Sequence, residues 1–149
     1  MAVVAPEAFE ERVRSSFARQ TVMETIGARL VRVAPGEVDI ELPVAPAVAQ
    51  QHGFVHAGIV STIADSACGY AALSLMDRGT AVLTAEFKIN LLAPAAGDRL
   101  VARGKVVRAG RTLSVATAEV EAISAAGSKV CAIMTATIMC VRDRGALSD

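Results

Sequence analysis

The chain has 149 residues, a length that predicts one domain over residues 1–149 with a sizeable buried core. Its 15 basic and 15 acidic side chains give a formal net charge of zero, which argues against recruitment of nucleic acid or of an anionic membrane surface. Apolar residues make up 53% of the chain and aromatic residues only 3%, so we expect another subunit to cover part of the surface.

The N-terminal segment, residues 1–20, is predicted to form a short amphipathic helix over Pro6–Arg19 that lies against the sheet as a lid. Phe9, Val13 and Phe17 recur at the spacing of one helical face. The acidic residues of this segment do not suit a secretory or transit leader, and the most apolar helix of the chain is interrupted by polar residues. We therefore expect a cytoplasmic protein that does not enter a membrane.

The core is predicted to span residues 28–142. It begins with two short β-like runs, Ala28–Val33 and Glu37–Leu42, that a Pro-Gly turn joins into a hairpin. A loop follows, and then a long apolar helix is predicted over Ala57–Leu75.

Four extended segments come after this helix, and turns rich in Pro and Gly separate them. They cover Ala81–Leu92, Arg99–Arg108, Thr112–Ser124 and Lys129–Arg142. We interpret them as a meander of long strands. The last segment is largely apolar on both faces, which indicates that it is covered twice or lies near an interface.

Asp65 is a lone carboxylate inside the apolar helix. An unpartnered buried carboxylate is costly, so a functional role is favoured over a purely structural acid. His56 precedes Asp65 by nine residues. At ~1.5 Å rise and about 100° per residue, the two lie roughly 13 Å apart on opposite helix faces. A site that uses both the helix start and Asp65 therefore requires a second helix, which a two-fold dimer supplies.

The predicted helix start offers its own chemistry. The amides of Ala57 and Gly58 are expected to lack partners within the helix, and the helix dipole places partial positive charge there. These amides can polarise a carbonyl or hold an oxyanion. An electrophile at the helix start and a carboxylate opposite it form a plausible acyl-transfer site.

At this point the residues resemble a known family. The similarity runs from about Ala28 to Val141 and rests on four stretches: QQHGFVHAG at 50–58, ADSA at 64–67, TAEFKINLLAPA at 84–95 and RAGRTL at 108–113. Together they resemble the hotdog-fold acyl-CoA thioesterases of the phenylacetate-degradation (PaaI) type. The resemblance implies an α+β fold in which a curved antiparallel sheet of about five or six strands wraps a long central helix. It also implies dimers whose sheets join edge to edge, and homotetramers.

The resemblance implies roles for five residues. Asp65 aligns with the catalytic carboxylate, which acts as general base or as nucleophile on the thioester. The amide of Ala57 aligns with the group that polarises the carbonyl, and His56 shapes the helix start beside it. Gln50 falls near the thioester, and Thr84 falls where relatives have a hydroxyl that positions water. The family usually has Gly where this chain has Ala57, so the extra methyl narrows the mouth of the site.

The remaining expectations concern substrate and cofactors. Gly58, Asn90, Lys88, Arg108 and Arg111 are predicted to bind substrate, and the three basic residues are candidates for the phosphates of coenzyme A. A thioester is already activated, so the only coenzyme expected is the coenzyme A of the acyl-CoA substrate. The i, i+4 pair of His52 and His56 lacks the acid of a zinc motif, and no metal site is predicted.

Two alternatives remain open beside acyl-CoA hydrolysis. One is an enoyl-thioester hydratase or dehydratase on the same fold, which typically needs a histidine close to the acid. The second is a non-catalytic acyl-CoA-binding module. A nucleophilic Cys68 with a histidine base is disfavoured, because the small apolar neighbours of Cys68 are typical of a buried core.

Overall fold

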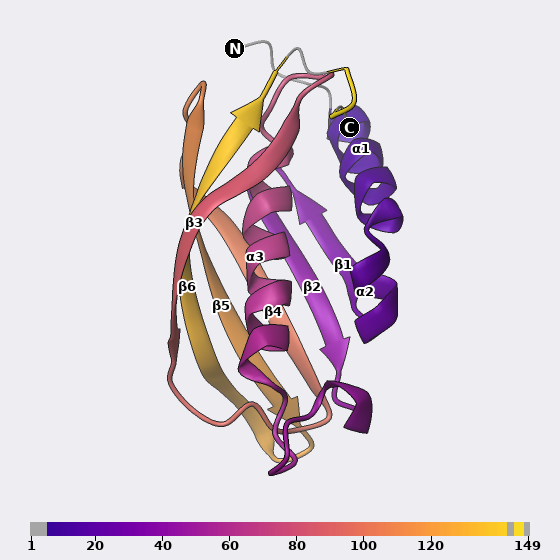
Figure 1. The fold of residues 1–149 in the computed structure, drawn as a ribbon, viewed down its shortest axis with the longest axis vertical. Helices are drawn as coiled ribbons and strands as arrows, with labels where there is room; N and C mark the ends of the chain where they lie inside the picture. Colours follow the sequence, from indigo (N-terminus) through magenta and orange to yellow (C-terminus); the bar gives the residue numbers. More distant parts are fainter. Residues whose placement is uncertain (1–5, 143–144, 148–149) are drawn as a thin grey trace.

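The structure is a computed structural model and describes residues 6–142 and 145–147. Six strands form one antiparallel sheet that curves around a long helix (Figure 1). In chain order the elements are α1 (Pro6–Arg19), α2 (Thr21–Ile26), β1 (Arg29–Ala34), β2 (Glu37–Pro43), the 3-10 turn η1 (Pro46–Val48), α3 (Ala57–Leu73), β3 (Ala81–Leu91), β4 (Arg99–Arg108), β5 (Leu113–Ser124) and β6 (Gly127–Val141). The predicted α+β hotdog architecture is confirmed.

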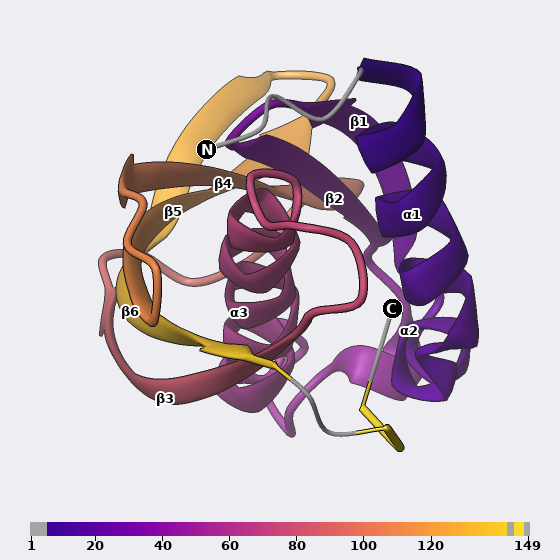
Figure 2. The same cartoon turned by 90° about the horizontal axis from the view of Figure 1, so that it is seen from above.

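The helix α3 fills the concave side of the sheet (Figure 2). Its apolar side chains, among them Val60, Ile63 and Leu73, are almost fully buried with Ile40 and Leu100 of the sheet. Burial of such side chains is worth about 1.5–3 kcal/mol each, which makes this layer the main source of stability.

The backbone of α3 comes very close to the sheet at Gly104 of β4. A Cβ atom built at Gly104 would overlap the carbonyl group of Ala67 on α3. Only glycine leaves enough room here, so Gly104 sets the distance between helix and sheet.

The order of strands differs from the predicted meander. The sheet runs β1-β2-β4-β5-β6-β3. The strand that follows α3 in the chain, β3, lies at the edge of the sheet and pairs with β6, while β4 pairs with β2. Of the four strands that follow α3, only β4, β5 and β6 lie side by side in chain order, as a meander requires. An alternating pattern reports which face of a strand is buried but does not identify the neighbouring strand, and for that reason the prediction was wrong.

The helices differ from the prediction in two respects. The short helix α2 was missed; it ends at Gly27, whose φ of 79° is left-handed. The helix α3 stops at Leu73, two residues early, because the Ser74 hydroxyl donates to the Ala71 carbonyl and accepts a bond from the Gly36 amide, both at 2.7 Å.

The first helix begins and ends as predicted but packs beside α3 against β1, at one edge of the concave side (Figure 2). The Arg12 guanidinium of α1 reaches the C-terminal end of α3 and donates to the carbonyls of Leu73 at 2.5 Å and Met76 at 2.9 Å. A cation suits this end because the helix dipole is negative there. The next residue of α1, Val13, is fully buried in the core.

At the edge of the sheet opposite β1, β3 is an edge strand with exposed apolar side chains. Leu83, Phe87 and Leu91 are 46%, 46% and 52% exposed. Long apolar edge strands invite pairing with another chain. None of the helices in the described part of the protein has the length and hydrophobicity that a membrane span needs.

Candidate active site

Asp65 lies on α3, half-buried, and faces β3. Its Oδ1 accepts a hydrogen bond from the Thr84 hydroxyl at 2.7 Å. Burial raises the pKa of Asp65 above its ordinary value, and the bond from Thr84 partly offsets this rise. A carboxylate with a raised pKa is a better proton acceptor than an ordinary one, which suits a general base.

A bulge in β3 gives Thr84 its orientation. The register with β6 shifts between Thr84 and Glu86, so Thr84 lies opposite the buried Ile138, whereas Lys88 lies opposite the exposed Thr135. Paired residues share a face of the sheet, so Thr84 faces the helix and Lys88 faces outward.

A cavity of about 520 Å³ surrounds Asp65. It lies between α3, the end of α1 and the first residues of β3. Its walls include hydroxyl and amide side chains from all three elements, and the lining residues are Ser16, Arg19, Gln20, Asp65, Ser66, Gly69, Tyr70, Ala81, Val82, Leu83, Thr84, Ala146 and Leu147.

Hydrogen bonds tie α1 and the residue after it to α3 across this cavity. The Ser66 hydroxyl donates to the Gln20 Oε1 at 3.2 Å, and the hydroxyls of Ser16 and Tyr70 lie 3.4 Å apart. The sequence reasoning missed these wall residues. A signal was present for Ser16, which follows the buried Val13 by three residues and so shares its helix face.

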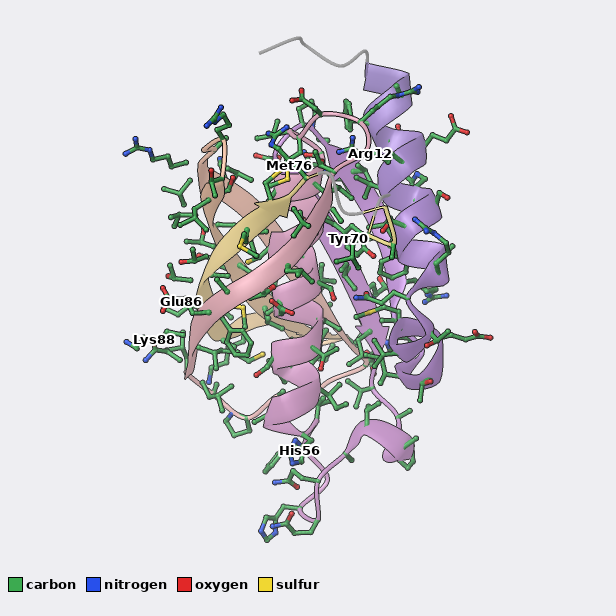
Figure 3. All side chains as sticks on the ribbon, turned by 45° about the horizontal axis from the view of Figure 1, so that its top comes forward. Arg12, His56, Tyr70, Met76, Glu86 and Lys88 are labelled. Atoms are coloured by element: carbon green, nitrogen blue, oxygen red, sulfur yellow. The ribbon has the colours of Figure 1, made fainter. Side chains whose placement is uncertain are left out.

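The start of α3 lies at the opposite end of the helix from Arg12 (Figure 3). His56 is the N-cap residue, and its Nδ1 accepts a hydrogen bond from the Gly58 amide at 2.8 Å. The expectation that both terminal amides are available is therefore wrong for Gly58. Within the described residues, the Ala57 amide has no hydrogen-bond acceptor, and Ala57 is exposed.

A second cavity, of about 580 Å³, adjoins this helix start. Gln50, His56 and Ala57 line it together with apolar residues such as Val60 and Leu91. The Gln50 carboxamide oxygen accepts a hydrogen bond from the His52 amide, which orders the loop. The two cavities share no lining residue.

The predicted site residues thus fall into two groups within one chain. Asp65 and Thr84 line the first cavity, and Gln50, His56 and Ala57 line the second. The expected separation of Asp65 from the helix start is present. The Asp65 cavity borders the first residues of β3, up to Thr84, whereas the cavity at the helix start borders its last residue, Leu91. One chain does not bring the acid and the free amide to the same space.

The remaining predicted substrate contacts lie elsewhere. Lys88 and Asn90 stand on the outer face of β3, and Lys88 points away from α3 (Figure 3). Arg111 lines a third cavity, of about 620 Å³, near the C-terminal end of α3. Arg108 is exposed at the end of β4. None of these four lines the Asp65 cavity, so their roles in substrate binding, and those of the three basic residues toward coenzyme A, stay predictions.

The cysteines do not fit nucleophilic chemistry. Cys68, Cys131 and Cys140 are buried, unpaired thiols. Burial raises the pKa of Cys68 to about 12, which leaves almost no thiolate at neutral pH.

Thr84 provides a test of how the carboxylate is tuned. Thr84→Val removes the bond that lowers the pKa of Asp65, so that pKa is expected to rise further. If the ionised carboxylate is the active form, the acid limb of the pH profile of kcat/KM moves to higher pH in the variant. Thr84→Ser keeps the hydroxyl and should keep the wild-type profile. An unchanged limb in Thr84→Val would contradict the assignment.

Comparison with known proteins identifies the family of this chain. Residues 52–127 match the model of the thioesterase superfamily. A thioesterase family protein from Silicibacter pomeroyi is 53% identical; the alignment covers 91% of this chain and 99% of that one, with a TM-score of 0.89. The Escherichia coli PaaI protein of the phenylacetic acid degradation operon shares the fold at 21% identity, with coverage of 95% and 98% and a TM-score of 0.81.

A curated relative from Listeria monocytogenes is named 1,4-dihydroxy-2-naphthoyl-CoA hydrolase. It is 27% identical over 94 residues, which are 63% of this chain and 76% of the relative. The family model covers more than half of the chain, and the predicted family is confirmed. This chain therefore belongs to the thioesterase superfamily and is a hotdog-fold thioester hydrolase.

Proposed function

We propose that the protein hydrolyses acyl-CoA thioesters at two equivalent sites of a homodimer, each built from Asp65 of one subunit and the Ala57 amide of the other. One observation carries this proposal. The tuned acid and the unpartnered amide occupy separate cavities of the same chain, at opposite ends of a free edge strand.

The properties of β3 support the dimer. Its exposed apolar side chains need a cover, and two-fold symmetry makes an edge strand pair antiparallel with its own copy. Antiparallel pairing about the middle of β3 brings the Thr84 end of one strand beside Leu91 of the partner subunit. The Asp65 cavity of one subunit then faces the helix start of the other.

The composite site suits thioester hydrolysis. The Ala57 amide of one subunit donates to the carbonyl oxygen and stabilises the negative charge that develops there. As general base, Asp65 takes a proton from water while the water oxygen bonds to the carbonyl carbon. The C–S bond then breaks, and the thiol of coenzyme A leaves with that proton. As nucleophile, Asp65 bonds to the carbonyl carbon, the C–S bond breaks and coenzyme A leaves as a thiolate; water then opens the mixed anhydride, which frees the acid and regenerates the Asp65 carboxylate.

Coenzyme A as the carrier of the acyl group is supported by the family and by the name of the Listeria relative, a CoA hydrolase. We propose a small aryl or a short- to medium-chain acyl group. The residues assigned above supply a carboxylate and a hydrogen-bond-donating amide, which suffice to hydrolyse a thioester that is already activated.

A panel of aryl, branched and linear acyl-CoAs tests the proposal, with a thiol-reactive dye reporting release of free coenzyme A. At least one class should be turned over far above the buffer rate, and the active species should have the mass of a dimer or a multiple of it. Crotonyl-CoA serves as a control: hydration of its double bond without thiol release would favour the hydratase alternative. Stoichiometric binding without turnover across the panel would contradict hydrolysis.

A further inference from the structure

An interior glycine of α3 forms part of the wall of the Asp65 cavity. Gly69 follows Asp65 by four residues and is buried. Four residues are about one helical turn, or roughly 6 Å along the axis. Gly69 therefore lies next to Asp65 on the same side of α3 and lines the same cavity.

Packing does not require a glycine at this position. A Cβ atom built at Gly69 meets only Val82 Cγ2, at 3.9 Å, an ordinary van der Waals contact. Glycine in the middle of a helix costs about 0.5–1 kcal/mol relative to alanine. Gly104 shows the opposite case, because its Cβ would overlap the carbonyl of Ala67. The protein thus keeps a destabilising residue where its own atoms leave room for a larger one.

Side chains between α3 and α1 bound the part of the cavity next to Gly69. Tyr70 projects from α3 toward α1 (Figure 3), where its ring lies 5.8 Å from that of Phe17 and its hydroxyl lies 3.4 Å from that of Ser16. Tyr70 and Ser16 are 7% and 8% exposed. A group that extends from Asp65 over Gly69 therefore enters a walled space between the two helices.

We propose that Gly69 is a specificity-determining residue: the acyl group of the substrate lies across it, and the missing side chain admits a ring or a branch next to the thioester carbonyl. This inference rests on the proposed function, since it assumes that Asp65 acts on the thioester. The substrate class is then a wide acyl group, aryl or branched. A narrow acyl group such as acetyl does not need the space.

Gly69→Ala tests the inference with benzoyl-CoA, isobutyryl-CoA and acetyl-CoA as probes. One added methyl group in a fitted pocket typically changes kcat/KM by about tenfold or more. We expect a loss of about that size for benzoyl-CoA, a smaller loss for isobutyryl-CoA, and a change of less than about twofold for acetyl-CoA. The slightly larger Gly69→Ser should lose more activity toward benzoyl-CoA than Gly69→Ala.

A stability measurement on the same variants separates this role from a packing role. Gly69→Ala should raise the Tm by a few degrees, because alanine favours the helix and meets no clash. Gly104→Ala is the matched control: it should lower the Tm and leave the ratio of benzoyl-CoA to acetyl-CoA activity unchanged. A lower Tm for Gly69→Ala would overturn the inference, because packing would then explain the glycine.

Two further results would count against the inference. An unchanged activity ratio in Gly69→Ala would show that the acyl group does not cross this position. An equal loss for all three thioesters, with weaker inhibition by free coenzyme A, would place the coenzyme there instead.

Asp65→Asn in the same assay distinguishes the two proposals. Full activity of that variant contradicts the proposed function. An unchanged activity ratio in Gly69→Ala, together with an inactive Asp65→Asn, contradicts only the role of Gly69. A wild-type chain inactive on all three thioesters overturns both.

Discussion

Asp65→Asn is expected to lower kcat for acyl-CoA hydrolysis by about a thousandfold, the scale of a lost general base. Asparagine has nearly the same shape and can still accept the hydrogen bond from Thr84, but its amide neither takes a proton from water nor attacks a thioester. Steady-state rates of thiol release measure the loss. Binding of a non-hydrolysable acyl-CoA analogue should persist, and a rate within severalfold of wild type would refute the assignment.

The same variant has an expected effect on stability that a structural acid would not produce. The pKa of Asp65 is raised in the folded protein, so the folded state binds this proton more tightly than the unfolded state. Stability therefore falls as pH rises through the raised pKa, and the cost is fully present above it. Asp65→Asn removes this cost and should raise the Tm near neutral pH. The difference in Tm between Asp65→Asn and wild type should vanish below the ordinary pKa of aspartate, where the carboxyl group is protonated in both the folded and the unfolded state. An acid held in a stabilising ion pair would show the opposite sign.

Ala57→Pro is the second variant with a large expected effect. Proline has no N–H, so the substitution removes the amide proposed to hold the carbonyl oxygen. Ala57 is the first residue of α3, where proline is well tolerated, and the preceding His56 has φ of −60° and ψ of 137°, which suits a residue before proline. Loss of one oxyanion donor typically lowers kcat by about 10²–10³-fold. Ala57→Gly keeps the amide and should stay within severalfold of wild type.

Mixing the two inactive variants tests whether the site is shared between subunits. In a heterodimer of Asp65→Asn and Ala57→Pro, one site carries both substitutions and the other carries neither. Random exchange of equal amounts puts half of the chains in heterodimers, so activity should recover to roughly a quarter of the wild-type value. The subunits are exchanged by dilution or mild denaturant before assay, and each variant treated alone is the control. No recovery, with exchange confirmed by mass spectrometry of tagged chains, would contradict a composite site.

Local sequence patterns were enough to place most elements and the acid. The helical spacing of Phe9, Val13 and Phe17 predicted α1 with its observed bounds, because one buried face repeats every 3.6 residues. The cost of a lone carboxylate in an apolar helix singled out Asp65, and the helix geometry alone separated it from the start of α3. The family of the chain was also legible in its sequence.

Three features of the site could not be predicted from the sequence, because they depend on contacts between segments that are distant in the chain. The position of β3 beside β6, the bulge that turns Thr84 toward Asp65, and the wall formed by Ser16 and Tyr70 involve residues far apart in the chain. The sequence determined which faces are buried and where an unusual charge lies. The fold determined which buried faces meet, because a periodic pattern indicates the buried face of a helix or strand but not the element that packs against it.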